Sequence, residues 1–277
     1  MSANPLTDLS RLCLHTITTK PWSIEEAAEK YSAAGIKGIT VWRDALSGRD
    51  IGKTGDMLRN YGLEIVSLCR GGFFPFKDKT GRETAIKDNR KAIEEAYKLG
   101  TKLIVLVCGS DPRQSLEDSR KQIFDGISAV LPDAAQAGIR LAIEPLHPMY
   151  ADARSAINTI AQANDMAEKL NSPWIGVAVD VYHLWWDPLL DEGISRCGKN
   201  GNLAAFHICD WKTPTVDMLN DRGLMGEGCI PIRKIRSWVE AAGFKGFIEV
   251  EIFSNEYWKQ DQTRFLNKVI EAYRNYA

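Results

Sequence analysis

The sequence lacks any long apolar run, since no stretch approaches the roughly 18 consecutive apolar residues of a membrane span. No run of basic residues stands out, and the formal net charge is −1. Residues 1–15 lack the basic flank and the apolar core of a secretory signal. We therefore expect a cytoplasmic protein that has no nucleic-acid partner and no membrane partner.

Cysteine is present but follows no motif. The six cysteines contain no CxxC pair, and several of them lie within apolar runs. In such runs cysteine behaves as a small buried hydrophobe. We therefore expect reduced thiols rather than a disulfide framework.

The chain also has no Pro-, Ser- or Gly-rich linker that would divide it, and no GxGxxG motif follows its first strand-like run. Short β-rich runs alternate instead with amphipathic segments of helical period. Helices are expected at 23–35, 50–61, 82–99 and 115–137. Strands are expected at 12–18, 37–43, 64–70, 101–109, 140–145, 174–183, 203–210 and 246–253.

Counting along the chain gives eight strand–helix pairs. Regular alternation of this kind predicts a parallel sheet with helices outside it, and eight units favour closure into a barrel. We therefore expect an α/β protein with one (β/α)₈ TIM-barrel domain over residues 1–277. A doubly wound open sheet is the structural alternative, which the missing GxGxxG motif disfavours.

Four polar residues stand at or near the downstream ends of four successive strand-like runs: Glu144, Asp180, His207 and Glu251. A charged group that ends a buried run is unfavourable unless it is paired or bound to a metal. The carboxyl ends of barrel strands meet at one mouth, where active sites of this fold are found. Each residue alone is more typical of an ion pair or a helix cap, but the four together predict one shared site.

Carboxylates with one imidazole form a hard ligand set that suits a divalent ion. We expect one such ion, Mn²⁺ in the first place, with Mg²⁺, Co²⁺ or Zn²⁺ as alternatives, because ligand type alone does not select the metal. Glu249 is the rival of Glu251 as the last ligand, since both face the same side of the final strand.

Further polar and aromatic residues are expected at the same mouth. All four histidines of the chain stand at predicted strand ends, and an arginine ends the third strand. The expected substrate-binding residues are His15, Arg70, His147, His183, Trp211, Lys212 and Arg222. Eight aromatic residues are expected near the mouth, where they favour a neutral, fairly large sugar: Trp42, Phe73, Phe74, Trp185, Trp186, Trp211, Tyr257 and Trp258.

Five motifs carry a family resemblance: EPLHP at 144–148, DVYH at 180–183, FHICD at 206–210, GEG at 226–228 and VEIFSNEYW at 250–258. With them the chain resembles the sugar phosphate isomerase/epimerase superfamily, the xylose isomerase-like TIM barrels. Ketose 3-epimerases, inosose isomerases and dehydratases belong to this group. The resemblance covers nearly the whole chain and is not specific to one substrate.

The resemblance implies a divalent metal held by Glu144, Asp180, His207 and Glu251. The VEIF motif favours Glu251 over Glu249. His183, in the DxxH pattern, and Arg222, in the loop before GEG, resemble the substrate-binding histidine and arginine of the family.

These groups predict a metal-dependent isomerase or epimerase of a keto-sugar or related polyol, acting through an enediolate. Glu144 and Glu251 are the expected acid–base pair. A lyase or dehydratase that uses the same site is the alternative, acting on an inosose, dehydroshikimate or a 3-keto-glycoside. A non-catalytic sugar-binding barrel is a more distant one. The expected partner is a small sugar, and barrels of this family often pair as homo-oligomers.

Overall fold

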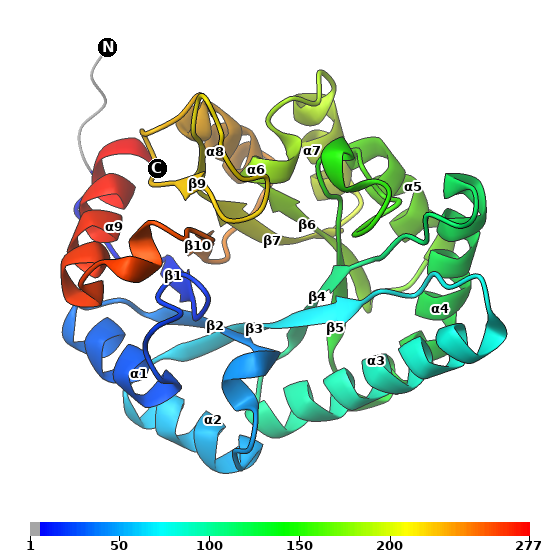
Figure 1. The fold of residues 1–277 in the computed structure, drawn as a ribbon, viewed down its shortest axis with the longest axis horizontal. Helices are drawn as coiled ribbons and strands as arrows, with labels where there is room; N and C mark the ends of the chain where they lie inside the picture. The colour runs from blue at the N-terminus through cyan, green and yellow to red at the C-terminus, as the bar shows by residue number, and fades with distance from the viewer. Residues whose placement is uncertain (1–5) are drawn as a thin grey trace.

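The computed structural model describes residues 6–277, and its central feature is a closed barrel of eight parallel strands. Their order around the barrel is β1-β10-β7-β6-β5-β4-β3-β2. The helices form a ring outside the strands (Figure 1). Strands with intervening helices can close in this way because each helix covers the apolar outer face of its strands. The predicted (β/α)₈ barrel is therefore confirmed.

The barrel strands are short. They are β1 (Leu12–His15), β2 (Gly38–Trp42), β3 (Glu64–Gly72), β4 (Leu103–Val107), β5 (Arg140–Glu144), β6 (Ile175–Asp180), β7 (Leu203–Ile208) and β10 (Ile248–Val250). Two further strands, β8 (Asp210–Trp211) and β9 (Arg222–Gly223), form a separate antiparallel ribbon.

The α-helices are α1 (Ile24–Ala33), α2 (Ile51–Asn60), α3 (Lys79–Leu99), α4 (Leu116–Ala137), α5 (Ile160–Leu170), α6 (Val181–Leu184), α7 (Leu190–Lys199), α8 (Ile232–Ala241) and α9 (Gln262–Tyr276). Three short 3₁₀ turns complete the structure: η1 (Arg43–Leu46), η2 (Pro148–Tyr150) and η3 (Tyr257–Lys259). Every helix between residues 6 and 277 is too short or too polar to span a lipid bilayer.

Local sequence signals set several helix ends. Ser23 caps α1 by accepting a hydrogen bond from the Glu26 amide, and the Glu26 carboxylate accepts one from the Ser23 amide at 2.8 Å. Gly100 and Gly138 end α3 and α4 in the left-handed conformation, which lacks a steric penalty only for glycine. These ends agree with the sequence prediction for the first helix and for the Gly-terminated helices.

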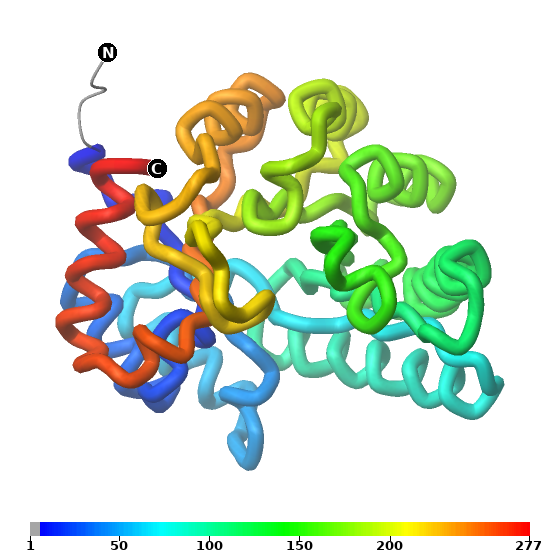
Figure 2. Tube along the Cα trace, turned by 45° about the horizontal axis from the view of Figure 1, so that its top comes forward, coloured from blue at the N-terminus to red at the C-terminus, as the bar shows by residue number. Residues whose placement is uncertain are grey.

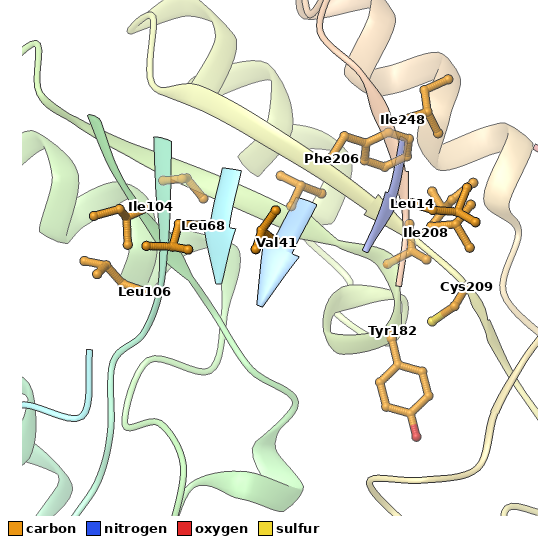
Figure 3. Close-up of a cluster of buried hydrophobic side chains, with 14 of the residues drawn as sticks. Leu14, Val41, Leu68, Ile104, Leu106, Tyr182, Phe206, Ile208, Cys209 and Ile248 are labelled. Carbon is orange, nitrogen blue, oxygen red and sulfur yellow. The ribbon is translucent and has the colours of Figure 1, made fainter. Parts of the chain in front are cut away.

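The two faces of each strand carry different side chains, as the period of two requires. The outward side chains, such as Leu14, Val41, Phe206 and Ile208, are buried against the helices (Figure 3). Many of the inward side chains are small or polar. A separate apolar cluster of Cys69, Leu103, Val105, Ala142, Ala178 and Ala205 fills the interior.

Seven of the eight predicted strands end one to three residues earlier than expected, and two of these ends have a local cause that their contacts show. The run 174–183 leaves the sheet after Asp180, because the Asp180 carboxylate accepts the Tyr182 amide at 2.8 Å and caps α6. The run 203–210 leaves it after Ile208, and Asp210 joins the β8–β9 ribbon. Both changes lie at the mouth of the barrel, where side chains rather than strand neighbours satisfy the backbone.

Candidate metal centre

Strand periodicity places the four predicted ligands at one level of the barrel. Glu144, Asp180 and His207 each follow an interior-facing alanine (Ala142, Ala178 or Ala205) by two residues. Glu251 follows the interior-facing Glu249 in the same way on the strand that pairs with β7. Side chains two residues apart point to the same side of a strand. The four side chains therefore converge one step nearer the mouth than the alanines.

The convergence is close and almost completely shielded from solvent. One ligand atom from each of Glu144, Asp180, His207 and Glu251 lies within 4.8 Å of the others. None of the four side chains is more than 5% exposed. The structure therefore brings together the whole predicted ligand set.

The contact between His207 and Glu144 fits a shared cation better than a hydrogen bond. His207 Nδ1 lies 3.0 Å from Glu144 Oε1, yet neither atom has a partner with hydrogen-bond geometry. Two ligands at about 2.1 Å from the same ion lie about 3 Å apart. Unpartnered buried polar atoms are rare in folded proteins, so these donor atoms fit a divalent ion.

The charge balance of the site also fits a cation. Burial lowers the pKa of His207, but the carboxylates of Glu249 and Glu144 outweigh it and raise the pKa to about 10. The carboxylates thus hold a proton on an imidazole that must be neutral to bind a metal. A divalent ion would replace that positive charge with its own.

Arg222 supplies a fixed positive charge beside two of the carboxylates. Its Nη1 donates to Glu251 Oε2 at 2.6 Å and to Asp180 Oδ2 at 3.1 Å. Burial lowers the pKa of Arg222, but Glu251 and Asp180 hold it well above its usual range. For Glu251, burial raises the pKa, but Arg222 and His15 keep it well below the ordinary value.

Asp180 titrates differently from its neighbour. Burial raises the pKa of Asp180 to about 7 against the opposing effect of Arg222, and the negative charge of Glu251 adds to the rise. Its two oxygens divide their contacts between the Tyr182 amide and Arg222. Asp180 therefore links the end of β6 to the β9 arginine.

His183 lies on α6 and faces the same arginine. Arg222 Nη2 lies 3.1 Å from His183 Nε2. Burial, followed by the positive charge of Arg222, lowers the pKa of His183 well below its usual value. A neutral ring that accepts from Arg222 at Nε2 carries its proton on Nδ1. That Nδ1 and the Nε of Arg222 have no partner among the described residues.

Glu249 lies deeper in the barrel than Glu251 and is held by protein groups. Its Oε2 accepts the Thr40 hydroxyl at 2.5 Å and lies 3.2 Å from His15 Nε2. The other ring nitrogen of His15 lies 3.1 Å from Glu251 Oε1. Burial lowers the pKa of His15, but Glu251 and Glu249 outweigh it and raise the pKa to about 9. This geometry favours Glu251 as the metal ligand, with His15 positioning it.

The remaining predicted substrate contacts divide into two groups. His147 and Trp211 lie together over α6, with ring centroids 5.0 Å apart, and Trp211 stacks on Tyr182 at 4.8 Å. Lys212 instead pairs with Asp221 at 2.7 Å and with Glu256. Its contact to substrate therefore remains a prediction.

The segment that carries Lys212 runs from β8 to β9 and loops over one side of the ring (Figure 2). The backbone carbonyl of Met218 in this loop accepts hydrogen bonds from the hydroxyls of Tyr150 and Tyr182. The sequence reasoning missed both tyrosines, although Tyr182 lies within the DVYH motif.

Two of the aromatic residues expected at the mouth lie elsewhere. Phe74 is buried against α4, and Tyr257 stacks on Phe265 of α9.

Arg70, the last of the predicted contacts, lies two residues before the end of β3, beside a cavity of about 430 Å³ at the mouth. Trp42 and Cys69 line the same cavity. Trp42 joins it to the carboxylate cluster, since its Nε1 lies 3.3 Å from His15 Nδ1. The centre thus has a ligand-sized space next to it.

The whole chain is similar in sequence and structure to several known proteins. The family model of the xylose isomerase-like TIM barrel matches residues 28–269. A curated inosose isomerase of Bacillus velezensis is 24% identical over 241 residues, which cover 84% of each chain. The crystal structure of protein SMc04130 from Sinorhizobium meliloti is 46% identical, with a TM-score of 0.94 over 98% of this chain and 99% of that one. The IOLI protein, crystallised with a zinc atom, has a TM-score of 0.82 and 20% identity over 96% and 99%.

Proposed function

The chain belongs to the xylose isomerase-like TIM barrel family, and from this premise we propose that it is a metal-dependent isomerase or epimerase of a keto-sugar or related polyol. The observation that carries the proposal is the buried convergence of Glu144, Asp180, His207 and Glu251 within 4.8 Å. The curated inosose isomerase supports the reaction class, because an isomerase of that kind acts on a polyol ketone.

The metal in this proposal is one divalent cation. Glu144, Asp180, His207 and Glu251 would hold it, and the zinc atom bound by the IOLI protein, which has the same fold, supports a divalent cation. The sequence expectation of Mn²⁺ stays part of the proposal, with Zn²⁺ as its first competitor. When bound, the cation supplies a Lewis acid that stabilises negative charge on the substrate oxygens.

The carboxylates of the site carry the proton transfers. Glu251 is ionised at neutral pH because Arg222 and His15 keep its pKa low, so it can accept the proton from the carbon next to the carbonyl. Glu144, from β5, returns a proton to the other face or to the neighbouring carbon of the enediolate. Proton exchange with solvent then returns Glu251 to its ionised form and Glu144 to its protonated form. Acid–base help of this kind typically contributes about 10²–10⁴ in rate.

Two buried N–H groups of the site are the proposed donors to the substrate oxygens. The Nε of Arg222 and the Nδ1 of His183 have no partner in the described part of the chain. Both belong to side chains fixed by other contacts, since Arg222 Nη1 and Nη2 are held by Glu251, Asp180 and His183. Donors that are already oriented stabilise developing negative charge without reorganising.

Hydrogen exchange tests the proposal. The protein is loaded with Mn²⁺ or Zn²⁺ and incubated in D₂O with a panel of ketoses and inososes, and ¹H NMR follows the α-proton. Deuterium at the α-carbon with a new keto-sugar as product supports an isomerase or epimerase. An unsaturated product would point to the dehydratase or lyase alternative. Absence of exchange across the whole panel, with binding retained, would leave only a sugar-binding barrel.

A further inference from the structure

The cavity beside the carboxylate cluster is linked to the proposed metal site through Trp42, which lines it and lies 3.3 Å from His15, the neighbour of Glu251. It is lined by residues at or just after the ends of β1, β2 and β3, among them Ile17, Trp42 and Arg70. Cys69 also lines it and belongs to the interior cluster of Ala142, Ala178 and Ala205. This adjacency lets a ligand that spans the two places keep its reacting carbons at the carboxylates and its far end in the cavity.

Two half-buried arginines at this side of the mouth have no counter-ion. Neither the Arg70 nor the Arg154 side chain makes a hydrogen bond or an ion pair with any residue from 6 to 277. Burial lowers the pKa of Arg70, and the positive charge of Arg154 lowers it further.

Arg70 and Arg154 differ from all other partly buried arginines of the described chain in having no hydrogen-bond or ion-pair partner. Within the described chain, each of the others donates to a carboxylate or to a backbone carbonyl: Arg11, Arg43, Arg82, Arg120, Arg140, Arg196, Arg222, Arg233 and Arg236. An unpaired and partly desolvated guanidinium is unfavourable. The fold therefore keeps one unpaired cation, Arg70, in the cavity wall, and a second, Arg154, near it over the ring of Tyr150.

The neighbouring acidic groups do not neutralise Arg70. Asp88 lies in the cavity wall but is held by both terminal nitrogens of Arg43, at 2.8 and 2.9 Å. Arg43 also donates to Glu95 at 2.6 Å. The Asp88 carboxylate is therefore paired with Arg43 and not with Arg70. Asp44 lies at the exposed rim of the cavity and makes no ion pair with Arg70 in the described structure.

The backbone around Arg70 is fixed before any ligand binds. The guanidinium lies 4.1 Å from the centre of the Phe73 ring. Phe73 has a φ of 52°, which is unfavourable for a bulky residue and is common at functional sites. Buried Asn89 holds the turn by accepting from the Gly72 amide at 2.7 Å and donating to the Gly72 carbonyl at 2.8 Å.

From these observations we infer that the substrate carries an anionic group, a carboxylate or a phosphate, which Arg70 and Arg154 bind at the end remote from the carboxylate cluster. The inference rests on the proposed function and narrows its substrate class to acidic keto-sugars. It differs from the neutral sugar that the aromatic residues favour on sequence grounds. A planar guanidinium already stacked on an aromatic ring offers a rigid fork to a carboxylate or phosphate.

A matched set of three ligands tests the inference: D-fructose, D-fructuronate and D-fructose 6-phosphate. They share the ketose end and differ at carbon 6, which carries a hydroxymethyl, a carboxylate or a phosphate group. Calorimetry on the metal-loaded protein measures affinity, and NMR in D₂O measures α-proton exchange. We expect at least one anion to bind roughly 10- to 100-fold more tightly than D-fructose, and the tighter anion identifies the group.

Variants separate this contact from general charge effects. Arg70→Gln should lower the affinity of the preferred anion to that of D-fructose, Arg70→Lys should restore part of it, and Arg154→Gln should lower it less. Arg264→Gln, which changes an exposed arginine of α9, is the control that should keep the preference. Equal binding of all three ligands, no measurable anion binding up to about 10 mM, or a preference that survives Arg70→Gln would overturn the inference. Binding that depends on Arg70 without any α-proton exchange would support the anion site while rejecting the isomerase proposal.

Discussion

Arg222 Nη1 lies 2.6 Å from Glu251 Oε2, and the same nitrogen lies 3.1 Å from Asp180 Oδ2. This one guanidinium therefore joins the β9 ribbon to the ends of two barrel strands. Its carbon also lies 4.4 Å from the centre of the Tyr182 ring. Two of the three carboxylates of the proposed metal site are thus oriented by a residue that lies outside the barrel strands.

Removing Arg222 should destabilise the protein as well as the site. Arg222→Ala leaves the buried carboxylates of Glu251 and Asp180 without their cation, and breaking such a pair typically costs about 3–5 kcal/mol. Urea unfolding measures the change in the free energy of unfolding. Arg236→Ala, which removes an arginine paired with Glu240 on the same helix, is the control and should cost no more than about 1 kcal/mol. Similar losses in the two variants would contradict the central role of Arg222.

Glu251→Gln should abolish α-proton exchange. The amide keeps the shape of the side chain but can neither accept the proton nor supply a full negative charge to the cation. We expect the exchange rate to fall by about 100-fold or more, as NMR in D₂O would measure. Glu256→Gln, in an exposed pair with Lys212, should leave exchange unchanged. Full activity in the Glu251 variant would mean that the base lies elsewhere.

Metal removal should lower the melting temperature. An ion at 100 times its Kd stabilises the folded state by about 2.7 kcal/mol. For a chain of this length that is a shift of about 5–8 °C. Differential scanning calorimetry after chelation, and again after adding back Mn²⁺ or Zn²⁺, measures the shift. His207→Ala should remove the response to added metal, and an unchanged response in that variant would place the ion at another site.

Asn89→Ala should destabilise the turn at Gly72, two residues after Arg70. The side chain of Asn89 is buried and makes three hydrogen bonds, to the Gly72 amide, the Gly72 carbonyl and the Ala85 carbonyl. Its loss leaves buried backbone groups unsatisfied, at a cost of about 2–4 kcal/mol. Chemical denaturation measures that loss. Asn60→Ala, at the exposed end of α2, serves as the comparison and should change stability by less than about 0.5 kcal/mol. Equal stability of the two variants would show that Asn89 does not hold the turn.

Thiol titration should detect one reactive cysteine in the folded protein. Cys229 is exposed, whereas Cys13, Cys69, Cys108, Cys197 and Cys209 are buried. Burial raises the pKa of each buried thiol, that of Cys197 to about 12. The fraction of reactive thiolate is therefore small at neutral pH and increases only as the pH rises. Ellman's reagent at pH 8 should modify one thiol per folded chain and all six after denaturation. Cys229→Ser should abolish the native signal; fast modification of a second thiol would show that the core opens.

The sequence supported the barrel and the ligand set for a shared physical reason. Alternation of strands and helices restricts the topology to a few folds, and the carboxyl ends of parallel strands meet at one edge. Glu144, Asp180 and His207 therefore had to lie close together once the barrel closed. The family motif favoured Glu251 over Glu249, but both face inward, and only the structure gave the physical reason for the choice. Glu249 is held by Thr40 and His15, whereas Glu251 lies with the other three ligand atoms.

The sequence by itself determined the alternation of elements, the closed barrel and the level at which four polar side chains converge, because these follow from local periodicity and strand direction. Only the tertiary structure decided which polar groups have partners. Lys212 is occupied by Asp221 and Glu256, whereas Arg70 has no partner in the described chain. The two side chains look alike in sequence, since each is a basic residue near a strand end. Their difference depends on loops whose packing joins residues remote in the chain, which no local pattern encodes.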